Sequence, residues 1–364
     1  MKLLIDASST KTGGALTHLI SLSKYFKYER EIKKVIIYAP TKTLVQIKKS
    51  KNIIKKTHFL LNSNVIFRMI WQIFFLKKIL IKEKVNCLFV TCGYYFINFK
   101  PTIVIPQNFL PFDEKSLKEY RFSYEFIRIY LLKIFLINSL KKADGIIFLS
   151  NFLKKFILKK IKLKAKKIKI IPHGIEKIKI KKYFKNYNKL VYVSDFEKYK
   201  NHMLLFKAIK KLPDKYDIKL TCIGDFKKIN KLKLDMSNQN LNKLDINFKD
   251  RIKRKKLLSY CRQQDIFIFN STCENFAITL LEGMASRLPI VCSNLEPMKS
   301  MIGSGGILVN CYKPRSISNG IKKYIESKEL RYRKAQLAYK RSLNFSEKLM
   351  ADKTYKFLYS FRKI

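Results

Sequence analysis

The chain has 364 residues, of which 47% are hydrophobic, and its formal net charge is +51. This hydrophobic content supports buried cores and excludes a disordered chain, and at about 100–200 residues per domain the length predicts two domains. The charge suits an anionic partner such as nucleic acid, anionic lipid or a phosphate-bearing substrate. The excess is mostly lysine, spread along the chain with abundant Ile, Asn, Phe and Tyr. AT-rich coding produces the same signature, and we interpret it as the main cause, because a dedicated patch shows as a local charge block.

Short apolar β-type runs alternate with longer helical patterns in both halves of the chain. In the first half we expect strands at 2–5, 34–38, 87–91, 103–105, 145–149 and 168–171, and helices at 16–26 and 124–142. In the second half we expect strands at 190–193, 219–223, 265–269, 289–292 and 307–309, and helices at 203–212, 277–286, 317–326 and 346–361. Alternating strands and helices indicate parallel sheets with crossover helices. The fold class is therefore α/β, with two doubly wound, Rossmann-like domains.

The polar, basic segment 176–188 is expected to link the two domains. The first domain would comprise residues 1–175 and the second residues 188–344. Ligands of open parallel sheets bind where the strands end, so the residues that follow strands are the ones to inspect.

Two long apolar stretches occur in the first half, at 65–81 and 127–140. Arg68 and the pair Lys77 and Lys78 interrupt the first, while Arg128 and Lys133 interrupt the second. Neither reaches the ~18 uncharged apolar residues of a spanning helix. Each is either a core helix or a helix lying on a membrane surface with lysines at its rim. The amino-terminal run is only a few residues long before Asp6, so we interpret it as a strand and not as a signal peptide.

The seven cysteines are scattered and form no C-x-x-C pair. Reduced thiols in a cytoplasm-like compartment fit this pattern best. A structural zinc site is not expected, because no four ligands cluster in sequence.

The densest chemical signal lies at 265–294, DIFIFNSTCENFAITLLEGMASRLPIVCSN. A buried strand leads through a small polar loop into a helix, whose first N–H groups, at Phe276, Ala277 and Ile278, would suit a diphosphate. Glu274 precedes this helix and Glu282 lies about two turns into it, roughly 80° away at ~100° per residue. Carboxylates accept hydrogen bonds from sugar hydroxyls. Alternatively, Glu274 is only a helix-leading acid favoured by the dipole, and Glu282 is a solvated side chain.

This segment resembles the E-x7-E signature of the retaining glycosyltransferases of family 4 (glycosyl transferases group 1), which have the GT-B fold. Glu274-Asn-Phe, Leu281-Glu282-Gly-Met-Ala and Pro289-Ile-Val-Cys-Ser match through the strand–loop–helix–strand unit. The resemblance implies that Glu274 lies near the transferred sugar and that Glu282 holds the nucleotide ribose. Asn275, Phe276 and Ala277 would complete this part of the donor site.

A second match is LVYVSDFEKYKNH at 190–202. The family pattern G-R-x-x-x-x-K-[GN] uses an arginine and a lysine to neutralise the donor diphosphate. Lys200 fits the lysine, and we expect it to act with Glu274 in catalysis. Ser194 and Asp195 stand where glycine and arginine are expected, so one cation is missing. Either Lys198 or another base replaces it, or the chain does without it.

Weaker matches complete the resemblance. Gly13 and Gly14 follow the first strand and resemble the family's loop near the donor phosphate and the acceptor, or else form a plain tight turn. Gly224 opens a Gly-Asp turn near the base. His173 is interpreted as a turn or interdomain residue, because no Ser, Cys or metal partner accompanies it. Where many relatives carry a histidine facing the acceptor, this chain has Gln107 and Asn108.

The resemblance implies a GT-B protein whose domains face each other across a cleft, with the segment 345–364 returning to the amino-terminal, acceptor-side domain. It implies transfer of a sugar from a nucleoside diphosphate, with retention, to a glycan or lipid-linked acceptor in cell-surface polysaccharide or lipopolysaccharide biosynthesis. No D-x-D pair occurs, so neither a metal nor a cofactor is expected. The expected location is cytoplasmic and peripheral, on the anionic inner face of the cytoplasmic membrane.

Other readings remain open: a sugar-nucleotide epimerase or inverting transferase of the same fold, an inactive transferase, or a basic nucleic-acid-binding protein. The last predicts arginines interleaved with aromatic residues or a recognition module, and neither occurs, so no specific nucleic acid partner is expected.

Overall fold

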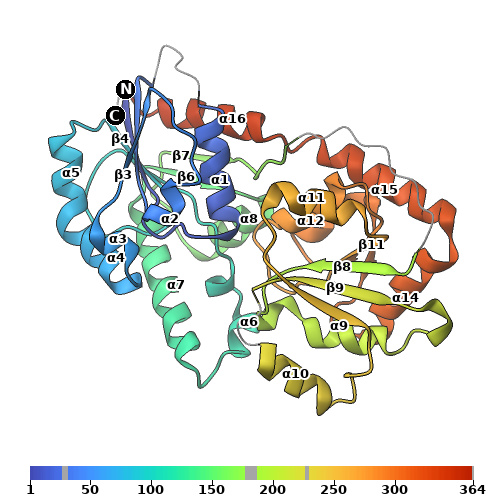
Figure 1. Cartoon of the computed structure of the whole chain (residues 1–364). Helices are drawn as coiled ribbons and strands as arrows, with labels where there is room; N and C mark the ends of the chain where they lie inside the picture. Colours follow the sequence, from blue (N-terminus) through green and yellow to red (C-terminus); the bar gives the residue numbers. More distant parts are fainter. Residues whose placement is uncertain (27–31, 177–186, 226–228, 363–364) are drawn as a thin grey trace. The chain divides into compact units, whose positions relative to one another are not determined.

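The computed structural model describes residues 1–26, 32–176, 187–225 and 229–362, and the chain divides into two compact units (Figure 1). Unit 1 consists of Met1–Gly174 and Phe345–Ile364, and unit 2 consists of Ile175–Asn344. Most of the linker expected at 176–188 lies outside the described residues.

Unit 1 is built on a seven-stranded sheet with the order β3-β2-β1-β4-β5-β6-β7, in which all neighbours run parallel. Its central strands are apolar and buried, as expected for strands covered on both faces. The strands are β1 Lys2–Asp6, β2 Lys34–Tyr38, β3 Ile53–Lys56, β4 Cys87–Val90, β5 Thr102–Val104, β6 Gly145–Phe148 and β7 Lys167–Ile170. The α-helices are α1 Gly13–Lys24, α2 Thr41–Leu44, α3 Phe59–Asn62, α4 Val65–Trp71, α5 Lys77–Lys82, α6 Glu114–Lys118, α7 Tyr124–Lys142, α8 Asn151–Lys160 and α16 Glu347–Tyr359. A π-helical turn, η1 Gln72–Leu76, joins α4 to α5, and a 3₁₀ turn, η2 Leu110–Phe112, precedes α6.

The last helix, α16, packs within unit 1 although the whole of unit 2 precedes it in the chain. The Tyr355 hydroxyl donates to the Leu22 carbonyl of α1 at 3.0 Å. Beyond the helix, the Phe361 ring fills the space over Gly145, where a Cβ atom would collide with it.

Unit 2 is built on a six-stranded parallel sheet with the order β10-β9-β8-β11-β12-β13. The strands are β8 Lys189–Val193, β9 Lys219–Gly224, β10 Ile246–Asp250, β11 Ile266–Phe269, β12 Ile290–Ser293 and β13 Gly306–Val309. The α-helices are α9 His202–Ile209, α10 Ile229–Ser237, α11 Arg254–Arg262, α12 Ile278–Ala285, α13 Met298–Ile302, α14 Pro314–Glu326 and α15 Lys328–Ser342. The 3₁₀ turns are η3 Lys198–Lys200, η4 Asp214–Tyr216 and η5 Gly303–Gly305. The predicted pair of parallel α/β sheets is therefore confirmed.

Several elements were not predicted from the sequence, among them β3, β10, α8, α11 and α15. The strands β3 and β10 lie at the outer edges of their sheets. Both are only partly buried, so their apolar alternation is weak. The helix α15 is rich in charged residues, which hides its apolar stripe.

The two apolar stretches of unit 1 are helical, but the core-helix interpretation accounts for only one side of each. Trp71, Leu76 and Leu80 are buried, whereas Ile66 and Phe74 on the same stretch are 60% and 61% exposed. Ile127 of α7 is 59% exposed. Within the described residues, no helix is long and apolar enough to cross a membrane.

Candidate donor-binding site

Eight of the predicted site residues belong to unit 2, on segments that follow β8, β9 and β11. These are Ser194, Lys200, Gly224, Glu274, Asn275, Phe276, Ala277 and Glu282. Because β9, β8 and β11 are neighbours in the sheet, these segments meet along one edge, which we call the carboxyl edge. Gly13 and Gly14 lie in unit 1, at the start of α1.

Lys200 and Glu274 form the central ion pair of the carboxyl edge. The Lys200 Nζ lies 2.5 Å from Glu274 Oε1, and the two side chains are only 14% and 13% exposed. Burial alone would lower the pKa of Lys200, but the Glu274 carboxylate and Tyr192 outweigh it, so the pKa stands above its ordinary value. The pair therefore places a firmly charged ammonium at the end of β8, beside the carboxylate that the sequence assigned to the sugar.

The turn that carries Lys200 is fixed to the loop after β11. The Tyr199 carbonyl accepts from the backbone N–H of Thr272 at 2.8 Å and from its hydroxyl at 3.0 Å. Asn201 adopts a left-handed conformation with φ of 60°, which asparagine tolerates better than most residues. Its side-chain amide donates to the Cys311 carbonyl at 2.6 Å. These contacts hold the two segments of the Lys200–Glu274 pair in one geometry.

The helix after Glu274 begins at Ile278, one residue later than predicted, and Ala277 is its N-cap residue. The Ala277 side chain has no group that could cap this end of α12. Helix N-termini favour anions, because their first N–H groups lack intrahelical acceptors. Gly283 lets α12 approach the sheet closely, since a Cβ atom there would meet the Phe267 ring of β11. The close packing sets the helix N-terminus at the carboxyl edge.

Glu282 is not a solvated side chain, because only 5% of it is exposed. Its Oε1 accepts a hydrogen bond from Arg254 Nε at 2.9 Å. Arg254 is the first residue of α11 and was not predicted as a site residue. The carboxylate expected to hold the ribose is thus already oriented by a guanidinium.

Ser194 and Gly224 lie where the loop after β8 crosses the end of β9. A Cβ atom on Gly224 would collide with the Ser194 carbonyl oxygen, which explains the glycine. Next to them, Asp195 accepts hydrogen bonds from Arg251, at 2.8 Å from Nε to Oδ1 and 2.5 Å from Nη2 to Oδ2. Lys198 occupies η3. The residue paired with Asp195 is therefore Arg251, which the sequence analysis missed.

The carboxyl edge of unit 1 holds Gly13 with a positive φ of 67°, a backbone conformation that favours glycine. The Nδ1 atom of His173 lies 3.1 Å from Nδ1 of His18, and both rings are buried. Gln107 donates through Nε2 to the Thr91 carbonyl at 2.8 Å.

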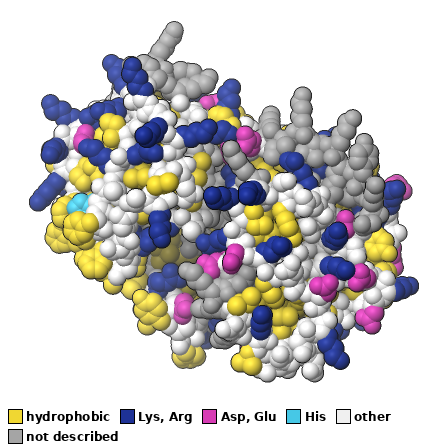
Figure 2. Space-filling model, viewed as in Figure 1, with side chains coloured by type: hydrophobic (Ala, Val, Ile, Leu, Met, Phe, Trp, Pro, Cys, Tyr) yellow, Lys and Arg dark blue, Asp and Glu magenta, His cyan; other side chains and the backbone are white. Residues whose placement is uncertain are grey.

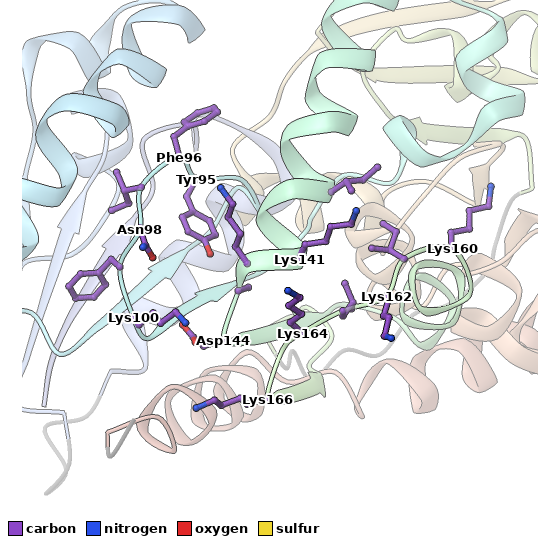
Figure 3. Close-up of a pocket in the computed structure, with 17 residues that line it drawn as sticks. Tyr95, Phe96, Asn98, Lys100, Lys141, Asp144, Lys160, Lys162, Lys164 and Lys166 are labelled. Atoms are coloured by element: carbon purple, nitrogen blue, oxygen red, sulfur yellow. The ribbon is translucent and has the colours of Figure 1, made fainter.

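A cavity of unit 1 with a volume of about 1090 Å³ lies elsewhere (Figure 3). Its lining includes seven lysines, the segment 95–100 and Asp144 (Figure 3). Asp144 accepts from the backbone N–H of Thr102 at 2.9 Å, at the start of β5. This cavity therefore lies at the amino-terminal ends of β5, β6 and β7, away from the carboxyl edge.

Across the described ranges, no group of three or more His, Cys, Asp or Glu residues could hold a metal ion.

Comparisons with known proteins match this architecture. The family model "Glycosyl transferases group 1" matches residues 175–341, and "Glycosyltransferase Family 4" matches residues 12–177. The chain therefore belongs to the group 1 and family 4 glycosyltransferases, a family of transferase enzymes. Among curated proteins, an uncharacterized glycosyltransferase of Methanocaldococcus jannaschii, MJ1069, is 33% identical over 205 residues, which cover 52% of each chain. The chain thus spans about half the length of the curated relatives it matches.

Solved structures confirm the GT-B fold. A sucrose-phosphate synthase from Thermosynechococcus elongatus is similar with a TM-score of 0.78 at 14% identity, over 99% of both chains. HepE of Anabaena, solved with UDP and glucose, is similar with a TM-score of 0.70 at 17% identity, over 99% of this chain and 100% of that one.

Proposed function

We propose that this protein is a retaining glycosyltransferase that moves a sugar from a nucleoside-diphosphate donor to a glycan or lipid-linked acceptor. The observation that carries this proposal is the largely buried Lys200–Glu274 pair, whose Glu274 lies on the loop leading to the N-terminus of α12. A cation and a helix N-terminus stabilise a diphosphate, while a carboxylate beside them accepts hydrogen bonds from sugar hydroxyls. The HepE structure with UDP and glucose supports a nucleotide-sugar donor by analogy.

In the proposed reaction, the bond between the anomeric carbon and the diphosphate oxygen breaks, and negative charge builds on the leaving diphosphate. The acceptor hydroxyl oxygen bonds to the anomeric carbon, and its proton passes to the leaving diphosphate. Lys200 and the N–H groups of α12 stabilise that charge in a site already organised before the reaction. The proposed reaction needs no divalent ion, because protein cations lie where the charge develops. Turnover that survives EDTA supports this part of the proposal, and loss of turnover that magnesium restores contradicts it. Retention is tested separately, by the anomeric configuration of the product.

The donor site is tested by thermal unfolding of the wild type and of Glu282→Ala, with UDP, GDP and ADP at fixed salt. A ligand at a hundredfold its Kd stabilises the folded state by about 2.7 kcal/mol. One nucleotide should raise the melting temperature of the wild type, and the shift should be lost in Glu282→Ala. If no nucleotide shifts the wild type while generic polyanions do, the proposed donor site is wrong.

We further propose that the protein works at an anionic membrane, on the cytoplasmic side, in the synthesis of cell-surface polysaccharide or lipopolysaccharide. Support comes from unit 1, where 14 of the 22 exposed large hydrophobic side chains in the described part of the chain occur in two segments. We call this set the apolar face: Phe59, Val65, Ile66, Phe67, Ile73, Phe74, Phe75, Ile81, Phe122, Tyr124, Ile127, Tyr130, Leu131 and Ile134. Figure 2 shows hydrophobic side chains gathered over α3–α5 and α7, with lysines and arginines around them.

The two segments are neighbours through Tyr94. Gln72 of η1 donates to the Tyr94 carbonyl at 3.5 Å, and the Tyr94 ring lies 6.5 Å from that of Phe135 on α7. Segments 59–82 and 121–142 together contain nine Lys and Arg residues and a single acidic residue, Glu125. Apolar side chains rimmed by cations suit a surface of anionic lipid.

A further inference from the structure

Asp195 stands where the family resemblance expects an arginine, and the structure puts a guanidinium against its carboxylate. Arg251 follows β10 directly and is 56 residues away in sequence. Its Nε and Nη2 atoms donate to the two carboxylate oxygens of Asp195 at 2.8 and 2.5 Å. This two-point contact fixes the plane of the guanidinium as well as its position.

The arrangement is built from three adjacent strands of unit 2. The backbone N–H of Asp225, after β9, donates to Asp195 Oδ1 at 2.9 Å, and Arg251 Nη2 lies 3.8 Å from Asp225 Oδ2. These bonds outweigh the effect of burial and hold the pKa of Asp195 below its ordinary value. Asp195, Asp225 and Arg251 therefore form one ordered cluster at the carboxyl edge.

Asp195 also connects this cluster to the central ion pair. Its carboxylate helps to raise the pKa of Lys200 as well as that of Arg251, so both cations lie within its electrostatic reach. A guanidinium has five N–H donors, and Asp195 engages only the Nε–H and one Nη2 hydrogen. The remaining donors on Nη1 and Nη2 are enough for a phosphate oxygen, and the Arg251 side chain is 44% exposed.

We propose that Arg251 supplies the second cation for the donor diphosphate, replacing from the end of β10 the arginine that position 195 lacks. This inference rests on the proposed donor site. Asp195 acts as a positioning residue that orients the guanidinium, while Lys200 binds the same diphosphate from the end of β8. The competing role for the cluster is a purely structural latch between the loops.

The test compares binding of UDP, GDP and ADP with binding of uridine, guanosine and adenosine, by calorimetry at fixed salt. Arg251→Gln should weaken binding of the preferred diphosphate at least about tenfold, the usual effect of losing a hydrogen bond between charged groups, and leave the nucleoside unchanged. Lys219→Gln is the matched control: Lys219 pairs with Asp217 at 3.6 Å and is 51% exposed, but it lies at the opposite end of β9. It should change neither affinity.

A charge reversal sharpens the test. The double variant Asp195→Arg with Arg251→Asp keeps the pair and moves the cation to position 195, and it should recover diphosphate affinity to within about threefold. Melting temperatures identify any variant that fails to fold, in which case Arg251→Lys, which keeps the charge, should bind the diphosphate better than Arg251→Gln.

The outcomes separate the two proposals. If the wild type binds no nucleoside diphosphate, the proposed donor site is wrong and this inference falls with it. If the wild type binds one but Arg251→Gln binds it equally well, or loses diphosphate and nucleoside in equal proportion, only the role of Arg251 is overturned.

Discussion

The carboxyl edges of the two sheets differ in chemistry, although both sheets are parallel. In unit 2 the edge carries three ion pairs: Lys200–Glu274, Arg254–Glu282 and Arg251–Asp195. In unit 1 it carries buried groups that burial drives towards their neutral forms. Burial raises the pKa of Asp6 and lowers that of His18 to about 4.

The edge of unit 1 is held together by hydrogen bonds. Gln72 Nε2 donates to Asp6 Oδ2 at 2.6 Å, and the Thr10 and Thr91 hydroxyls lie 2.9 Å apart. We infer that the charged groups that would bind the proposed diphosphate belong to unit 2. The unit 1 edge is instead lined by amide and hydroxyl groups that hydrogen-bond to one another and to Asp6.

The difference between the two carboxyl edges is tested most directly by replacing Lys200. Lys200→Ala should lower donor turnover at least about 100-fold, the usual cost of removing one stabiliser of a developing anion. It should also destabilise unit 2 by about 3–5 kcal/mol, because Glu274 is left buried without its cation. Turnover is measured with the nucleotide sugar whose diphosphate shifts the melting temperature. Stability is measured by unfolding of the variant without ligand.

Lys198→Ala is the control for Lys200→Ala, since Lys198 lies in the same turn and is exposed. Adding Glu274→Gln to Lys200→Ala should recover part of the lost stability but not the turnover. If Lys200→Ala retains turnover within about threefold of Lys198→Ala, charge recognition does not reside in this pair.

The lowered pKa of the buried His18 in unit 1 predicts that stability falls at acid pH. The folded-state pKa of His18, about 4, lies below its ordinary value of 6.5, so the unfolded chain takes up the proton first and stability falls as pH drops from 6.5 towards 4. Between pH 7 and pH 5, His18 should cost unit 1 about 2 kcal/mol of unfolding free energy. The raised pKa of Asp6 acts in the opposite direction, so the wild type must be compared with His18→Gln.

Trp71 provides the measurement, because it is the single tryptophan of the chain and is fully buried in unit 1. Its fluorescence during urea unfolding at pH 7 and pH 5 reports on unit 1. The wild type should lose about 2 kcal/mol more than His18→Gln over this interval. Equal losses would mean that His18 does not stay neutral in the fold.

Much of the charged edge could be predicted from sequence, because its residues follow strands with strong apolar patterns. Lys200, Glu274 and Glu282 stand in local motifs, and their strands β8 and β11 are buried throughout most of their length. Arg251 and Arg254 could not be predicted in the same way. They follow β10, an edge strand with weak alternation, and they meet their partners only through the sheet order.

The two apolar stretches show a different limit. Their composition predicted helices, yet sequence alone left core and surface roles open, because both roles use the same residue types. The structure shows that each stretch buries one side and exposes the other. A helix that is apolar on two sides needs a second apolar partner besides the core.

The surfaces of the two units can be compared through the apolar face, which belongs to unit 1. Replacing Ile66 and Phe74 with Asn should weaken binding to phosphatidylcholine vesicles containing 30% phosphatidylglycerol about tenfold, because two exposed anchors are lost. Co-sedimentation measures the bound fraction.

The matched control replaces Leu234 and Leu349, which are 60% and 43% exposed but lie outside the apolar face, and it should bind like the wild type. Vesicles without phosphatidylglycerol should bind weakly, since the rim of lysines and arginines has no anionic lipid to attract. If the face instead packs against a second copy of the chain, the wild type sediments as a dimer, the Ile66 and Phe74 variant becomes monomeric, and vesicle binding is the same for both.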